Sequence, residues 1–158
     1  MSLNSFFTDP QPKKPVAKPK PIPKKPTVHK TRQTRSDKRH NVKFPVTPME
    51  HQQLKVAFKQ ASIWYKQHKD KELTQTAFNT FLLAYALHHI ENVNWNKPYK
   101  DSKRYMHTQP LESDYKEIGG PYGLATRKGL SDRKIVYYLV ISALEWVRKD
   151  GDYAKILQ

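Results

Sequence analysis

A pattern of one short strand followed by two helices occurs twice in this chain, and this recurrence limits the folds available to it. In the first copy, Val42, Phe44 and Val46 alternate with polar residues or proline. A period of two predicts a strand with one buried face. The second copy opens with a comparable segment at residues 103–108. A lone strand leaves backbone N–H and C=O groups unpaired, so we expect the two strands to form an antiparallel ribbon.

Capping residues predict where the helices of each copy begin. Thr47 and Glu50 match a capping box, with proline between them at the first helical position. Thr74 is expected to cap the second helix of the first copy, and Ser131 that of the second copy. Sliding the second copy by 57 residues aligns these two caps and superimposes apolar positions of both helices. The first helix of the second copy is short, because residues 119–121 are Gly-Gly-Pro.

Four helices below a two-stranded ribbon make a mainly α fold with a short antiparallel ribbon (α+β). The segments NVKFPVTPMEHQQL and GLSDRKIVYYLV resemble the ribbon-helix-helix family of DNA-binding proteins. That family usually builds its ribbon from two identical chains, whereas both copies lie on one chain here. The resemblance therefore implies tandem ribbon-helix-helix units that form an intramolecular pseudo-dimer. It is similar in this respect to relaxosome accessory proteins of conjugative plasmids.

Composition divides the chain near residue 40. Residues 1–40 hold 11 basic and 2 acidic residues and seven of the twelve prolines. Such a segment cannot bury enough apolar surface to become ordered, so residues 1–39 are predicted to be a disordered, basic, Lys/Pro-rich arm. The alternative is a solvated spacer without a partner, but a spacer does not need so many cations. We expect the following further divisions: a first unit at 40–92, a linker at 93–101, a second unit at 102–150 and a C-terminal tail at 151–158.

The net charge of +15 points to a polyanionic partner, either nucleic acid or an acidic membrane surface. The longest apolar run, residues 135–144, is about half the ~20 residues that a membrane-spanning helix needs, so no membrane insertion is expected. No secretory signal is recognised, which favours a cytoplasmic protein. Cysteine is absent, which excludes thiolate zinc sites and cysteine nucleophiles.

We expect neither an enzyme nor a cofactor. His88 and His89 are adjacent on a predicted helix and face different directions, so they cannot chelate one metal ion. Tyr137 and Tyr138 lack a companion histidine cluster and are interpreted as packing aromatics rather than DNA-cleaving nucleophiles. The chain contains no P-loop and no Gly-rich dinucleotide turn. No catalytic or metal-binding residue is therefore assigned.

A two-stranded ribbon fits the major groove of duplex DNA, where side chains on its outer face meet base edges. The residues expected on this face are Asn41, Lys43, Pro45, Lys103, Tyr105 and His107. Asn can pair with adenine and Lys with guanine, whereas proline could only touch a thymine methyl. The alternative is that these are merely exposed strand residues. The resemblance also implies that the second helices begin against DNA phosphates, which assigns phosphate contacts to Thr74, Gln75, Thr76, Ser131, Arg133, Arg127 and Lys128.

The expected function is sequence-specific binding of double-stranded DNA. The tandem resemblance implies an accessory relaxosome protein that binds near the transfer origin of a conjugative or mobilisable element. The arm would then contact a relaxase or coupling protein, and several copies could form higher-order arrays on DNA. A transcriptional repressor or plasmid copy-control regulator is the alternative within the same chemistry. An interaction protein whose basic arm binds acidic partners is the alternative from another class.

Overall fold

The computed structural model describes residues 15–23, 33, 35 and 37–158 and divides the chain into two units, Met1–Gln33 and Thr34–Gln158. In the first unit, residues 15–23 have neither helix nor strand, and their side chains are exposed. Most of the predicted arm lies outside the described residues. The folded unit begins before the predicted boundary, because the Lys38 carbonyl accepts a hydrogen bond from the Glu112 amide at 2.9 Å and Arg39 forms a β-bridge with Leu111.

The two strands of the folded unit come from the two segments in which strands are predicted, and they pair with each other. Strand β1 (Val42–Pro45) lies antiparallel to strand β2 (Tyr105–Thr108), with Phe44 opposite Met106. Both of these side chains are buried, so this face of the ribbon closes the core. The prediction of a mainly helical fold with a two-stranded antiparallel ribbon is confirmed.

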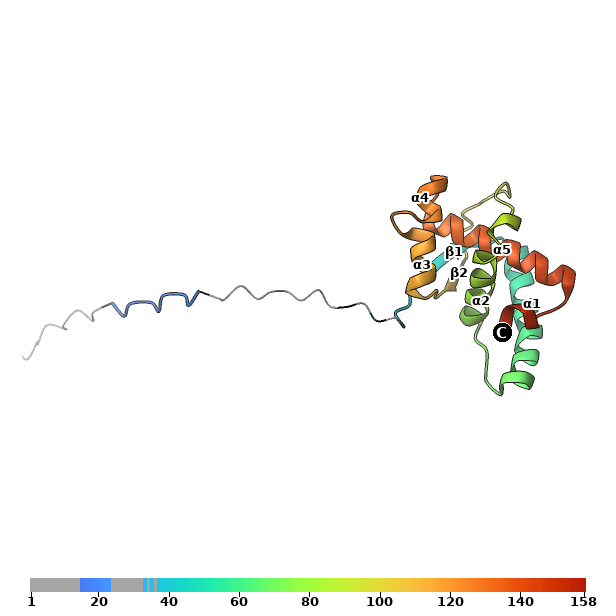
Figure 1. Cartoon of the computed structure of the whole chain (residues 1–158), viewed down its shortest axis with the longest axis horizontal. Helices are drawn as coiled ribbons and strands as arrows, with labels where there is room; N and C mark the ends of the chain where they lie inside the picture. Colours follow the sequence, from blue (N-terminus) through green and yellow to red (C-terminus); the bar gives the residue numbers. More distant parts are fainter. Residues whose placement is uncertain (1–14, 24–32, 34, 36) are drawn as a thin grey trace, which may run out of the picture. The chain divides into compact units, whose positions relative to one another are not determined.

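Two main helices follow each strand, with shorter helices between and after them. In the first half they are α1 (Pro48–Lys69), α2 (Gln75–Leu87) and the short 3-10 helix η1 (Ile90–Asn92). In the second half they are α3 (Glu112–Gly119), α4 (Leu124–Lys128), α5 (Asp132–Asp150) and α6 (Ala154–Leu157). Figure 1 shows α3 and α4 at one end of the folded unit and α1 at the other, with α5 running between them.

The predicted caps begin the main helices. Thr47 Oγ1 accepts from the Glu50 amide at 3.2 Å, and Glu50 Oε2 accepts in return from the Thr47 amide at 2.9 Å. Thr74 caps α2 and Ser131 caps α5, each through its side-chain oxygen. These contacts satisfy amides that have no partner inside a helix. Local sequence therefore determines where α1, α2 and α5 start.

Each second helix packs beneath the strand of the other half. Helix α5 contacts β1, and α2 contacts β2. Asn79 of α2 is fully buried and donates to the His107 carbonyl at 3.1 Å, while Thr80 Oγ1 accepts from the Gln109 amide at 2.9 Å. The two halves therefore share one core, and neither buries its second helix without the strand of the other.

The predicted linker lies packed on α5. The Trp95 ring is 5.8 Å from that of Tyr138, and the Tyr99 ring is 5.3 Å from that of Tyr137, between ring centres. Lys97 forms an ion pair with Glu145. Residues 93–101 therefore cross the surface of α5 before the chain returns to the ribbon at β2. We call this segment the linker strap.

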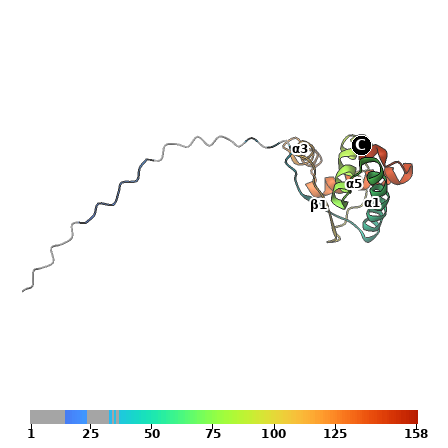
Figure 2. The ribbon, with the colours of Figure 1, turned by 90° about the horizontal axis from the view of Figure 1, so that it is seen from below.

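The predicted C-terminal tail contains helix α6, which the sequence pattern did not indicate. Ile156 and Leu157 are buried, and the Tyr153 hydroxyl donates to the Gln60 side chain of α1. Figures 1 and 2 both place the C-terminus beside α1. The end of the chain is therefore part of the core.

Candidate nucleic-acid interface

The outer face of the ribbon brings together four of the six predicted base-reading residues. Residues directly opposite in an antiparallel pair share a face, so Lys43 lies beside His107. His107 Nδ1 donates to Asn41 Oδ1 at 3.3 Å, and Lys43 Nζ lies 4.6 Å from the centre of the Tyr105 ring. Both contacts run diagonally from one strand to the other. Asn41 and His107 are exposed, while Lys43 and Tyr105 are half-buried.

The other two predicted base-reading residues require correction. Pro45 is buried, and Tyr105 lies directly opposite on the same face, close enough to cover it. Pro45 therefore has no free surface to offer a thymine methyl. Lys103 is exposed but precedes β2 in a turn, where its φ is 58° and its amide donates to Asp101 Oδ1. The strand starts only at Tyr105, so Lys103 does not lie on the ribbon face.

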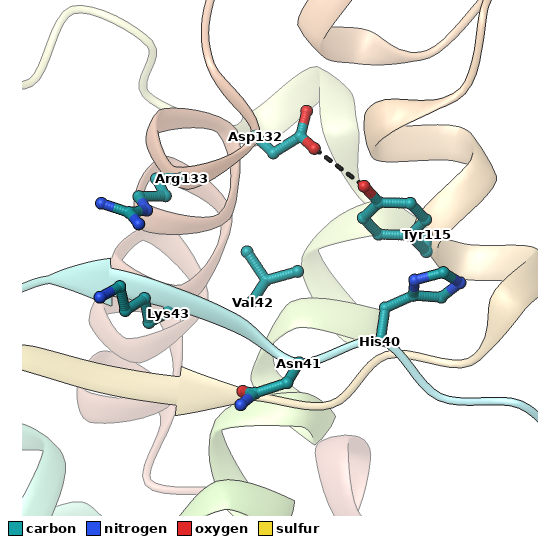
Figure 3. A pocket seen from close by; sticks show the side chains of 7 residues that line it. All are labelled: His40, Asn41, Val42, Lys43, Tyr115, Asp132 and Arg133. Atoms are coloured by element: carbon teal, nitrogen blue, oxygen red, sulfur yellow. Dashed lines mark hydrogen bonds between the residues drawn. The ribbon is translucent and has the colours of Figure 1, made fainter.

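Arg133, predicted to contact phosphate, extends this face from the first turn of α5. Its guanidinium lies 5.7 Å from the Tyr105 ring, so the ring has Arg133 and Lys43 as cationic neighbours. A hollow of about 400 Å³ opens beside Lys43 and Arg133, and Figure 3 shows these two side chains on the same side of it, with Val42 between them and Tyr115. The two cations are placed where an anion beside the ribbon would meet both.

On the opposite side of the hollow, a network of side-chain contacts holds His40, which lies just before β1. His40 stacks on Tyr115 with ring centres 4.0 Å apart and pairs with Glu112. The Tyr115 hydroxyl donates to Asp132 Oδ2 at 3.0 Å (Figure 3). The hydrogen bond from His40 lowers the pKa of Glu112, and the hydrogen bond to Asp132 raises the pKa of Tyr115. Asp132, whose negative charge would repel a phosphate, is thus engaged by a hydroxyl group.

Polar groups in the first turn of α2 form hydrogen bonds to Asn79 and Thr80, the residues that contact β2 and the segment after it. Thr74 is exposed as the cap; the Gln75 side chain donates to Asn79 Oδ1 at 3.0 Å, and the Thr76 carbonyl accepts from Thr80 Oγ1 at 2.8 Å. A second hollow, of about 410 Å³, lies at this turn, and its largely uncharged lining includes charged residues of both signs, which are Arg39, Glu72 and Asp114. The predicted phosphate contacts at α2 therefore lie in a mixed electrostatic environment.

The remaining predicted phosphate contacts surround the start of α5. Ser131 is exposed and accepts from the Lys134 amide at 3.4 Å. Arg127 and Lys128 are exposed in the last turn of α4, and Lys128 Nζ lies 4.3 Å from the centre of the Trp95 ring. These two cations do not line the hollow beside the ribbon.

Sequence reasoning missed the residues that support the site from behind. His40, Glu112 and Tyr115 meet only because the ribbon brings together segments about seventy residues apart, and no local pattern signals this. Asn79 did carry a signal, because it and Thr80 are the polar residues inside an otherwise apolar stretch of α2. A buried amide at such a position usually has a backbone or side-chain partner.

The chemistry available at this face is hydrogen bonding and positive charge. In the part of the chain that the structure describes, no three His, Asp, Glu or Cys side chains converge as metal ligands. No helix there combines the length and the apolar character needed to cross a membrane. The chain matches no protein-family model, no curated protein and no solved structure. A functional conclusion therefore has to rest on the geometry of the ribbon and the helices beneath it.

Proposed function

We propose that the chain is a tandem ribbon-helix-helix protein, folded as an intramolecular pseudo-dimer, that binds double-stranded DNA through the outer face of its ribbon. The register of the strands is the observation that carries this proposal. Aligning the segment TPME (47–50) with QPLE (109–112) makes Met106 the counterpart of Phe44, and these two residues lie opposite each other. In a symmetric dimer, the two-fold axis makes equivalent residues face one another in this way.

The placement of the second helices gives independent support. Helices α2 and α5 begin at Thr74 and Ser131, the two caps that a shift of 57 residues superimposes. Each of them packs under the strand of the other half. A reciprocal exchange of this kind is expected of two chains that form one ribbon, and here a single chain supplies both partners.

The outer face has the chemistry to read base edges in the major groove. The Asn41 amide can pair with adenine, and the Lys43 ammonium and the His107 imidazole can donate to guanine acceptors. Arg133 lies next to this face as a partner for the DNA backbone. Because β1 and β2 present different residues, the two half-sites that they read should differ.

The biological role that we propose is that of an accessory relaxosome protein at the transfer origin of a conjugative or mobilisable element. This step rests on the resemblance to tandem relaxosome accessory proteins and not on a contact in the structure. The basic N-terminal segment, most of it outside the described residues, is the proposed contact for a relaxase or coupling protein.

Selection of duplexes from a random library with the full-length protein tests this function. We expect enrichment of one non-palindromic sequence, with a footprint beside a nick site when the selected site is mapped onto the DNA that carries the gene. A footprint over a promoter would instead favour a repressor. Failure to enrich any duplex above a scrambled control would contradict sequence-specific DNA binding.

A further inference from the structure

Three aromatic side chains around the start of α5 each have a basic side chain over the ring. Lys128 Nζ lies 4.3 Å from the centre of the Trp95 ring, and Lys134 Nζ lies 5.2 Å from that of Tyr99. Tyr105 has two cationic neighbours, at 4.6 and 5.7 Å. Such distances are within the range of cation–π attraction. We call this surface the basic-aromatic band and define it by Trp95, Tyr99, Tyr105, Lys43, Lys128, Arg133 and Lys134.

The band is continuous from the ribbon to α4. Arg133 and Lys134 are consecutive residues in the first turn of α5. The Trp95 and Tyr99 rings both contact Tyr138, at 5.8 and 6.5 Å between ring centres. Burial raises the pKa of Tyr99, whereas the positive charge of nearby Arg133 acts to lower it. The linker strap and the start of α5 thus form one surface that continues the outer face of the ribbon.

This surface offers fixed cations rather than free aromatic faces. Trp95 and Tyr99 pack against the buried rings of Tyr137 and Tyr138 and meet a lysine as well, so an incoming base would have to displace that lysine in order to stack. Lys128, Arg133 and Lys134 form no ion pair with a carboxylate of the described residues. Ammonium and guanidinium groups held in place over rings are suited to phosphate oxygens.

Among the described residues, the α2 side of the ribbon presents no aromatic ring with a basic side chain over it. Helix α2 begins on this side, beside the carboxylates of Glu72 and Asp114, and Arg39 is the cation in the same hollow. The loop that precedes α2 is short and carries Lys71 between the acidic residues Asp70 and Glu72, whereas the segment that precedes α5 carries α4 with Arg127 and Lys128. Electrostatic attraction for a DNA backbone is therefore stronger on the α5 side.

We propose that the basic-aromatic band binds the backbone phosphates of duplex DNA that flanks the ribbon site on the α5 side, so that the protein covers more DNA on one side than on the other. This inference rests on the proposed function. A longer contact on one side gives the bound protein a direction on the DNA, in addition to the difference between the two half-sites.

The test measures binding of the full-length protein to its selected site with about ten base pairs of extra duplex on one side or on the other. We expect one extension alone to strengthen binding. The variant K128A/R133A/K134A, which removes three cations of the band, should lose that gain. Raising the salt concentration from 50 to 200 mM weakens binding to the extended duplex. If the variant lacks three phosphate contacts, this weakening should be about 40-fold smaller for the variant than for the unaltered protein. The control variant K55A/K59A/K66A removes the same charge from exposed positions on α1 and should keep the gain.

Equal gains from both extensions, or from neither, with specific binding to the short site intact, would overturn the inference and leave the proposed function standing. A gain from a single-stranded overhang but not from duplex would also overturn it, because the band would then contact unpaired bases. Absence of specific binding to the short site would contradict the proposed function itself. Thermal unfolding of each variant shows whether the fold is retained.

Discussion

Replacing Tyr137 by phenylalanine removes one hydroxyl group that joins the two halves of the fold. Tyr137 lies on α5 of the second half, is almost fully buried, and donates to Glu50 Oε1 at 2.6 Å. Glu50 belongs to the first half, where its other carboxylate oxygen accepts from the Thr47 amide in the capping box. The hydroxyl also lies 3.3 Å from the Pro98 carbonyl in the linker strap. The substitution changes no apolar packing, so its effect isolates the hydrogen bonds of this hydroxyl.

The expected cost is about 1.5–3 kcal/mol of unfolding free energy, because a hydrogen bond to a charged group stabilises by about this amount and the remaining Glu50 carboxylate is half-buried. For a folded unit of this size, this corresponds to a decrease in Tm of about 5–12 °C. A neutral hydrogen bond at the surface would contribute less than half as much.

Denaturant and thermal unfolding of Tyr137→Phe and Tyr138→Phe measure the effect against a matched control. Tyr138 is the next residue on the same helix and is also buried, but its hydroxyl makes no hydrogen bond within the described residues. We expect Tyr138→Phe to change stability by less than about 0.5 kcal/mol. In a double-mutant cycle, Tyr137→Phe should couple to Glu50→Gln. Equal effects of the two tyrosine substitutions, without coupling to Glu50, would refute the claim that this contact joins the halves.

Three further predictions concern the pseudo-dimer, the N-terminal segment and alkaline stability. Residues 40–92 expressed alone should be unfolded or homodimeric in sedimentation experiments, because α2 packs under β2 of the other half; a folded monomer would contradict the tandem model. Removal of residues 1–33, which include eight basic residues, should flatten the slope of log affinity against log salt by about 3–4 while leaving the footprint unchanged; an unchanged slope would mean that this segment does not touch DNA. Burial, followed by the bond to Glu50, raises the pKa of Tyr137 above its ordinary value near 10. The contribution of Tyr137 to the unfolding free energy is therefore intact below pH 10 and is lost as the pH rises further. The decrease in unfolding free energy at alkaline pH should be smaller for Tyr137→Phe than for the unaltered protein.

Features set by local chemistry were predictable from the sequence, and features set by distant contacts were not. The capping box at Thr47, the caps Thr74 and Ser131, and the buried alternation of β1 follow from spacing of three or two residues. The burial of Pro45 depends on Tyr105 in the opposite strand, sixty residues away.

The same distinction applies to the candidate site. Strand periodicity predicts Asn41, Lys43 and His107 on one face, and the structure brings them together there. The same alternation predicts Lys103 on this face, but its φ of 58° places it in a turn before the strand. The packing of the linker on α5 joins rings and cations that lie far apart in the sequence, so the basic-aromatic band has no local signature.

The most direct test of the central claim, that the ribbon reads base pairs, compares the affinity of the full-length protein for its selected duplex and for a scrambled duplex. The comparison is made for the unaltered protein and for the variant Asn41→Ala/Lys43→Ala/His107→Ala. We predict that the unaltered protein prefers the selected duplex by at least about 1000-fold, as specific DNA-binding proteins generally do. The variant should lose most of this preference, since each groove-reading residue contributes about 1–3 kcal/mol, while its Tm and its affinity for the scrambled duplex change little. A variant that retains the full preference, or an unaltered protein that binds both duplexes equally, would contradict the account.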